Sequence, residues 1–174
     1  FHGNPAEYPF DDNQGVMQVL FGVKDGRLHF LDGWPDVNNA SATVEFHNAS
    51  LLVENARSYE SSGGSARVTA TIPDLRKAML SVKGNITAPA DELQLYIWNS
   101  GLDPILGRAV EQFQASGQAD IELDISVPLG KDRKTTDKLQ AAGDITFRDN
   151  ELFFPVTDHQ LTRVNGKLIF NTIS

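Results

Sequence analysis

The chain has 174 residues, 15 Lys and Arg against 23 Asp and Glu, a formal net charge of −8 at pH 7 and no cysteine. The acidic balance disfavours binding to nucleic acid or anionic membranes through a basic surface, and the missing thiols exclude disulfides, thiolate catalysis and cysteine-ligated metals. The length suits one domain, and because the chain starts abruptly at Phe1, we expect residues 1–174 to be a single fragment of a larger protein.

The N-terminal part is predicted to form strands, because apolar and polar residues alternate in it. In "GVMQVLFGV" the apolar positions are Met17, Val19, Phe21 and Val23. Asp25-Gly26 follows, and this dipeptide predicts a two-residue hairpin turn that sends the chain back along the first strand.

Alternation continues as far as residue 88, in three further segments. Apolar residues share a face in "ATVEFHN" (Val44 and Phe46), in "ARVTATIPDL" (Val68, Ala70 and Ile72) and in "SVKGNIT" (Val82 and Ile86). We therefore expect antiparallel strands with one apolar side and one polar side.

The spacing of the apolar residues changes from that of a strand to that of a helix at about residues 90–113, which predicts a helical insertion there. "DELQLYIWNSG" fits a short helix that ends near Gly101. A second helix is predicted in "DPILGRAVEQF", with Asp103 as the N-cap and Pro104 as its first residue. The apolar stripe that is expected to pack on the sheet consists of Ile105, Leu106, Ala109, Val110 and Phe113.

Strands resume after the helices in "GQADIELDISVP", whose two faces differ sharply. One face holds Ala119, Ile121, Leu123, Ile125 and Val127, and the other holds Gln118, Asp120, Glu122, Asp124 and Ser126. A charged connector at 128–138 leads to "GDITFRDNELFF", which is predicted to turn at Asp149-Asn150, and "VNGKLIF" is the last strand.

These elements predict a mainly β fold with one or two helices. One amphipathic helix of about three turns is too small to cover every one-faced strand. The apolar face must therefore close on itself as a sandwich or barrel, or line an open groove, and the alternation alone allows both.

Catalytic and metal motifs are missing from the sequence. The four histidines, at 2, 29, 47 and 159, occur in no two-ligand spacing, and no Gly-x-Ser-x-Gly occurs. Asp120, Glu122 and Asp124 are successive positions on one face of one strand, which favours a solvated exterior over a catalytic pair facing across a cleft. We therefore expect no enzyme activity, no metal and no cofactor.

Several short segments follow one another in a distinctive order from about Gly15 to Phe170. They are "GRLHFLDGWPDV", "ARVTATIPDL", "LSVKGNITAPADELQLYI", "GQADIELDISVPLG", "GDITFRDNELFF" and "LTRVNGKLIF". Their order and spacing resemble the central region of the YhdP family of AsmA-like proteins. The matching positions are Trp34-Pro35, Ile72-Pro73-Asp74-Leu75, Gly84, Gly117, Val127-Pro128-Leu129, Gly143, Asn150 and Gly166.

Proteins similar to this are large envelope proteins of Gram-negative bacteria, anchored in the inner membrane, extending through the periplasm and implicated in moving phospholipid toward the outer membrane. The resemblance implies a strongly curved antiparallel sheet that forms an open U-shaped groove, with the helix against its concave side. It also implies that the partners are phospholipid acyl chains and neighbouring groove repeats of the same chain. Membrane contact would occur only through parts outside this fragment, and neither nucleic acid nor a catalytic residue is implied.

The resemblance and the strand parity together assign candidate groove residues. Acyl chains would contact Val82, Ile86, Ile121, Leu123, Ile125, Ile145, Phe147, Leu168 and Phe170. The helix residues facing the groove would be Ile105, Leu106, Ala109, Val110 and Phe113.

Two other classes of function remain open at this point. One is a structural spacer with a closed, dry core. The other is a carbohydrate-binding or hydrolytic β-sandwich that uses Trp34 or Trp98 as a stacking platform and the acidic strand as catalyst. The shape of the apolar face separates the three: an open trough, a sealed sandwich, or a polar cleft with inward carboxylates.

Overall fold

The computed structural model describes residues 2–12, 14–29, 34–59, 64–129 and 139–172. They form one nine-stranded sheet in which every strand pair is antiparallel, in the order β1-β2-β3-β4-β5-β7-β8, with β9 beyond β8 and the short β6 also paired to β8. The strands are β1 Gln18–Leu28, β2 Val37–His47, β3 Ser50–Tyr59, β4 Ser65–Ile72, β5 Met79–Pro89, β6 Gln114–Ser116, β7 Gln118–Pro128, β8 Gln140–Phe154 and β9 His159–Asn171. The helical elements are η1 Pro5–Glu7, α1 Ala90–Trp98, η2 Asp103–Gly107 and α2 Arg108–Val110.

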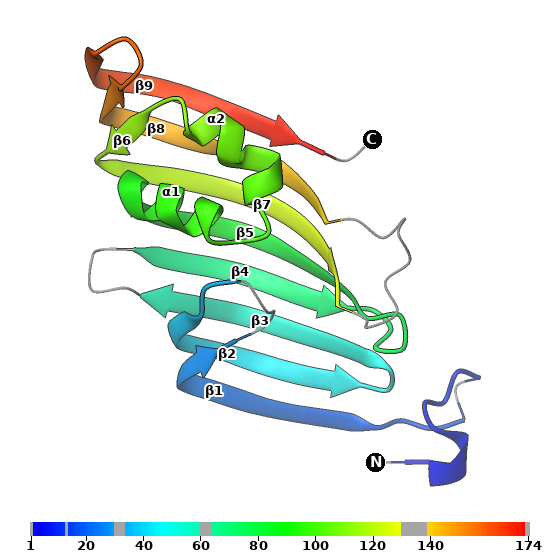
Figure 1. Ribbon diagram of the computed structural model, residues 1–174. Helices are drawn as coiled ribbons and strands as arrows, with labels where there is room; N and C mark the ends of the chain where they lie inside the picture. The colour runs from blue at the N-terminus through cyan, green and yellow to red at the C-terminus, as the bar shows by residue number, and fades with distance from the viewer. Residues whose placement is uncertain (1, 13, 30–33, 60–63, 130–138, 173–174) are drawn as a thin grey trace.

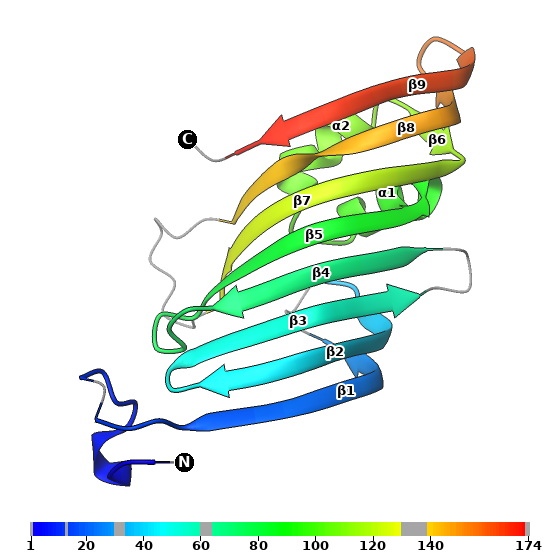
Figure 2. The ribbon, with the colours of Figure 1, turned by 180° about the vertical axis from the view of Figure 1, so that it is seen from behind.

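The sheet is curved and open. Its outer strands, β1 and β9, lie at opposite ends and are not paired with each other within the described part of the chain. Figure 1 shows α1 and α2 on one face, in front of β5, β7 and β8, whereas Figure 2 shows the opposite face without helices. The expected mainly β fold, an open curved antiparallel sheet with helices against its concave side, is therefore confirmed.

Two predicted hairpin turns are instead bulges inside long strands. Asp25 (φ 52°) lies within β1 and Asp149 (φ 57°) within β8, and the pairing register shifts at both places. An Asp in the left-handed region suits either a tight turn or a bulge, so the local signal did not separate the two. The chain turns back only after Phe154, through residues 155–158.

The helical insertion differs from the predicted continuous second helix. It consists of a π-turn, η2, followed by the short α2, and Leu102 rather than Asp103 occupies the N-cap position, without a side-chain cap. The side-chain amide of Gln94 in α1 explains why the helix stops at Val110. Its Nε2 donates to the carbonyl oxygens of Val110 (3.0 Å) and Phe113 (2.8 Å), and its Oε1 accepts from the backbone N–H of Ala115 (3.1 Å).

Two glycines allow neighbouring strands to approach closely in the curved part of the sheet. Gly84 and Gly143 lie on either side of Leu123 in the pairing of β5, β7 and β8. A Cβ at Gly84 would clash with the carbonyl oxygen of Arg67, and one at Gly143 (φ 155°) with that of Glu122. Side chains at these two positions would force the strands apart.

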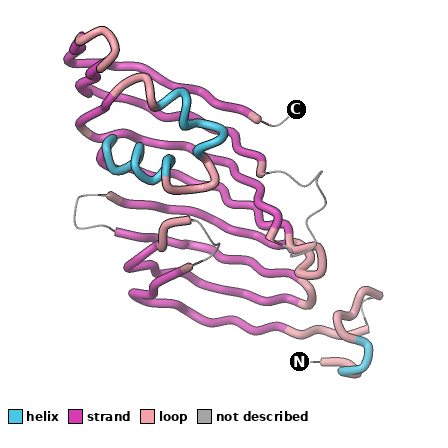
Figure 3. Tube along the Cα trace, viewed as in Figure 1, coloured by secondary structure: helices cyan, strands magenta, loops and turns pink. Residues whose placement is uncertain are grey.

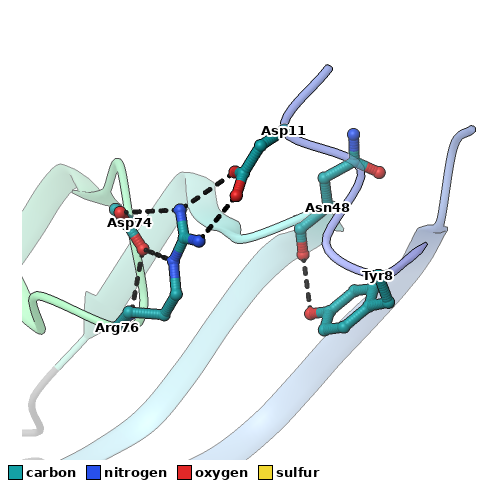
Figure 4. Close-up of polar contacts among 5 residues, drawn as sticks. All are labelled: Tyr8, Asp11, Asn48, Asp74 and Arg76. Atoms are coloured by element: carbon teal, nitrogen blue, oxygen red, sulfur yellow. Dashed lines mark hydrogen bonds and ion pairs between the residues drawn. The ribbon is translucent and has the colours of Figure 1, made fainter. Parts of the chain in front are cut away.

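An N-terminal segment crosses the strand ends at one side of the sheet (Figure 4). The Tyr8 hydroxyl donates to the carbonyl oxygen of Asn48, in the β2–β3 turn, at 3.0 Å. The guanidinium of Arg76, in the β4–β5 loop, contacts Asp11 at 2.8 Å and Asp74 at 2.8 Å. These contacts hold the segment against two loops that are far apart in the sequence, and the hydrogen bond from Arg76 lowers the pKa of Asp74.

Candidate functional site

The concave face is covered with apolar side chains that continue from strand to strand. Because directly paired residues of antiparallel strands point to the same side, the register defines rows that run across the strands. The longest row is Phe21, Val44, Val53, Ala70, Val82, Ile125 and Ala141, with one residue from each strand from β1 to β8 except β6. A neighbouring row is Ile86, Ile121, Ile145 and Leu168, from β5 to β9.

The register places all nine predicted groove residues on this face. Leu123 lies between Gly84 and Gly143, and Phe170 is paired with Gly143. The buried members of the set are Ile121, Ile125, Ile145 and Phe147, and the half-buried members are Val82, Ile86, Leu123, Leu168 and Phe170. Their placement on one face agrees with the parity argument, whereas contact with lipid remains a prediction.

The helical insertion covers only one part of the concave face, over β5, β7 and β8 (Figure 3). Leu106 and Val110 are buried in the core, and Ile105 and Phe113 pack against it, but Ala109 is exposed. The Phe113 ring lies edge-on to Phe147, with 6.1 Å between the ring centroids. The four buried groove residues therefore belong to a packed core beneath the helices.

Trp34 belongs to the same packed core. It comes just before β2, is buried, and lies edge-on to Tyr96 of α1 at 6.3 Å between centroids. Burial raises the pKa of Tyr96 to about 12. Trp34 is thus a core side chain rather than an exposed platform for a sugar ring.

The apolar face is not covered over β1. Phe21 is 43% exposed, and Val19 and Val23 on the same face are also exposed. Phe21 stacks on Phe46 of β2 with 6.3 Å between ring centroids. These residues are not among the nine predicted groove residues, although the alternation in "GVMQVLFGV" and "ATVEFHN" places them on an apolar face of the same kind.

The convex face carries the charges. Lys83 pairs with Asp124 at 2.7 Å and Lys167 with Asp144 at 3.0 Å, each between adjacent strands, and Arg148 pairs with Asp120. The acidic side of β7 therefore faces solvent, as the sequence predicted. Two of its three carboxylates, those of Asp120 and Asp124, pair with cations on neighbouring strands.

Asn150 is the main polar side chain at the end of the concave face. It is 0% exposed; its Nδ2 donates to the carbonyl oxygens of Ser116 (2.8 Å) and Gln118 (2.9 Å), and its Oδ1 accepts from the N–H of Arg148 (2.6 Å). It joins β8 to the break between β6 and β7, a role that spacing alone did not indicate. Across the described residues, no buried side-chain nitrogen or oxygen lacks a partner.

The face therefore offers apolar contact and little else. Among the described residues, no group of three or more His, Asp or Glu side chains is arranged to hold a metal ion. None of the described helices is long and apolar enough to cross a membrane. A surface of this kind can bind a long hydrocarbon chain without recognising a particular polar group.

Comparison with known proteins agrees with the resemblance in the sequence. The model of the family described as "YhdP protein" matches residues 1–172. The chain belongs to the YhdP family. This YhdP-family chain is 27% identical over 170 residues to the Escherichia coli (strain K12) protein named "Intermembrane phospholipid transporter YhdP". That match covers 98% of this chain but 13% of the E. coli protein. No solved structure matches the chain.

Proposed function

We propose that this chain is a non-enzymatic segment of a phospholipid transporter, and that its concave apolar face holds acyl chains as they move between the inner and outer membranes. The single observation that supports this most is the set of apolar rows running across the strands from β1 to β9. The similarity to the E. coli protein named an intermembrane phospholipid transporter supports the same class of function.

Movement along the rows follows from the nature of the contacts. Neighbouring strands are about 4.8 Å apart, so an acyl chain lying across the strands passes from one side chain to the next in short steps. Each methylene buried on the face gains about 0.8 kcal/mol. Since each step exchanges one apolar contact for a similar one, the acyl chain is held on the face without a deep free-energy minimum at any one strand.

The acyl chains first occupy the part of the face that the helices leave open. Phe21 and its row neighbour Val44 begin this path, and the half-buried groove residues continue it beside the helical insertion. Ile121, Ile125, Ile145 and Phe147 form the floor under the helices and contact lipid only where the helices leave room.

The two outer strands connect the segment to its neighbours. β1 and β9 each have one backbone edge that pairs with no described strand, and exposed edges of this kind readily add another strand. Residues 1–174 form one unit of a longer groove in this proposal, with neighbouring repeats of the same chain pairing at both edges. The unit lies in the periplasm, and other parts of the protein make the inner-membrane anchor and the membrane contacts.

The charged convex face suits this location, because its carboxylates discourage adhesion to anionic membrane surfaces. A spacer with a sealed core is less well supported, since Phe21 and its neighbours on β1 are exposed. A carbohydrate-binding or hydrolytic sandwich is also less well supported: Trp34 is buried, and although Trp98 is 39% exposed, it belongs to α1 on the concave side, whereas the acidic face of β7 is convex.

Native mass spectrometry of the full-length protein, purified in mild detergent, tests the proposal. The wild-type protein should release bound phospholipid, and the double variant Phe21→Asp/Val23→Asp should release much less. Leu20→Asp, on the opposite face of the same strand, is the matched control and should release the wild-type amount. Absence of phospholipid from the wild type, or equal amounts from all three proteins, would contradict the proposal.

A further inference from the structure

A cavity of about 610 Å³ lies outside the apolar rows, between α1, β6 and the ends of β8 and β9 that meet at their turn. Its walls include Asp91, Leu95 and Trp98 of α1, Glu151 and Phe153 of β8, and Gln160 of β9. The volume is in the range of small-molecule sites. The chemistry of the walls differs from that of the concave face, because carboxylates and aromatic rings occur together.

The charge of the cavity is entirely negative. Asp91 and Glu151 both line it, and its described walls contain no lysine, arginine or histidine. Within the described residues Asp91 makes no side-chain hydrogen bond or ion pair, and Glu151 accepts one long hydrogen bond from Gln160 at 3.3 Å. Such a site repels phosphate and carboxylate groups and attracts a cation.

The aromatic rings select the kind of cation. Trp98 is 39% exposed although it is large and apolar, and Phe153 is half-buried. Aromatic faces attract organic ammonium groups, through both the ring quadrupole and contact with the alkyl carbons. A hydrated metal ion would gain nothing from these rings or from Leu95, whereas an alkylammonium group would contact both.

The walls are held in place before any ligand arrives. Gln94, which also lines the cavity, uses its amide to bind the carbonyl oxygens of Val110 and Phe113 and the N–H of Ala115. These bonds fix α1 to the start of β6 and leave Gln94 unavailable to a ligand. A preformed site loses less entropy when it binds.

We propose that this cavity binds an alkylammonium group, with Asp91 and Glu151 balancing its charge and Trp98 and Phe153 contacting its carbons. The proposal does not depend on the lipid groove, since the cavity shares no residue with the apolar rows. Two sources have this chemistry: the ethanolamine head of a phospholipid, whose phosphate would stay outside the acidic walls, and a free soluble amine.

Isothermal titration of the full-length protein with ethanolamine hydrochloride, with choline chloride and with sodium phosphate tests the proposal. The two amines should bind saturably and phosphate should not. Asp91→Asn/Glu151→Gln should weaken amine binding at least about tenfold, as expected for losing charge-assisted contacts. Phe153→Ala should weaken it several-fold. Glu111→Gln removes an exposed carboxylate that does not line the cavity, so it should leave binding unchanged.

A second arm identifies the source of the ammonium group. Mixed micelles containing phosphatidylethanolamine, compared with micelles containing phosphatidylglycerol, should show preferential binding that the double variant abolishes if the ligand is a lipid head. Binding of free ethanolamine without that preference would indicate a soluble amine, and either result supports an alkylammonium site. The proposal is wrong if neither amine binds saturably, if phosphate binds as well as the amines, or if the double variant binds amines like the wild type.

Discussion

A carboxylate at Phe21 should slow phospholipid transport without unfolding the segment. Phe21 lies on the uncovered part of the concave face, so replacing it removes only part of a buried side chain. Full burial of such a side chain stabilises a protein by about 1.5–3 kcal/mol, and we therefore expect Phe21→Asp to lower the free energy of unfolding by about 1–2 kcal/mol. That loss is small against a typical domain stability of about 5–15 kcal/mol.

The effect on transport should be larger. The Phe21 ring contacts roughly two or three methylenes of a passing acyl chain, and their loss removes about 2 kcal/mol at that point of the path. An ionised carboxylate next to hydrocarbon adds a desolvation cost. Since every 1.4 kcal/mol corresponds to about a factor of ten, phospholipid transport should slow by about tenfold or more.

The assay is the rate at which newly made, labelled phospholipid reaches the outer membrane in cells that depend on the variant protein. Leu20→Asp is the control, because Leu20 lies on the convex side of the same strand, is 63% exposed and is paired with Glu45 of β2. Circular dichroism should first show that both variants are folded. Equal transport rates for folded Phe21→Asp and Leu20→Asp would refute the reasoning.

Three further predictions concern stability. Asn150→Leu leaves the backbone groups of Ser116, Gln118 and Arg148 without their hydrogen-bond partner and should lower the free energy of unfolding by about 3–5 kcal/mol in urea titrations. Asn165→Leu, at an exposed position, should lower it by less than about 1 kcal/mol. Gly143→Ala should lower the free energy of unfolding by at least about 2 kcal/mol, because the added Cβ meets the carbonyl oxygen of Glu122. Gly166→Ala should lower it far less, because no atom lies within 4 Å of the Cβ added there. Equal losses for the two variants would contradict the packing argument. Arg76→Ala should speed amide hydrogen exchange in residues 2–12 and 14–16. Because Arg76 lowers the pKa of Asp74, the stability contributed by this ion pair is present above the usual Asp pKa of about 3.9 and disappears as the pH falls through the lowered value. If Arg76→Ala leaves the exchange rates of the N-terminal segment unchanged at neutral pH, the Arg76 contact does not hold that segment in place.

The sequence best predicted which side of the sheet each strand residue faces. The positions from Val82 to Phe170 that were assigned to one face all lie on it, because a side-chain period of two is a local property of any strand. The bulge at Asp149 reverses the parity within β8, so that Asn150 and Leu152 are buried where continued alternation would have exposed them. A local pattern cannot show this reversal unless the bulge is recognised first.

Contacts between distant segments were not predictable in the same way. Gln94 ends α2 by binding carbonyl oxygens 16 and 19 residues away, and helix propensity contains no information about such a partner. The same holds for Trp34, which meets Tyr96 only because the four strands between them, β2–β5, bring the two together. Whether the sheet stays open also depends on the pairing of β1 and β9, and alternation within a strand does not determine what lies at its edge.

Site-specific photocrosslinking in living cells tests the central claim most directly. Neighbouring apolar residues on opposite faces provide two pairs: the exposed Phe21 and Leu20 on β1, and the half-buried Phe170 with Ile169, which is 75% exposed, on β9. A photoreactive amino acid placed at 21 or 170 of the full-length protein should capture phospholipid, and the same residue at 20 or 169 should not. Equal capture on both faces, or capture on the convex face alone, would contradict an acyl-chain path along the concave rows.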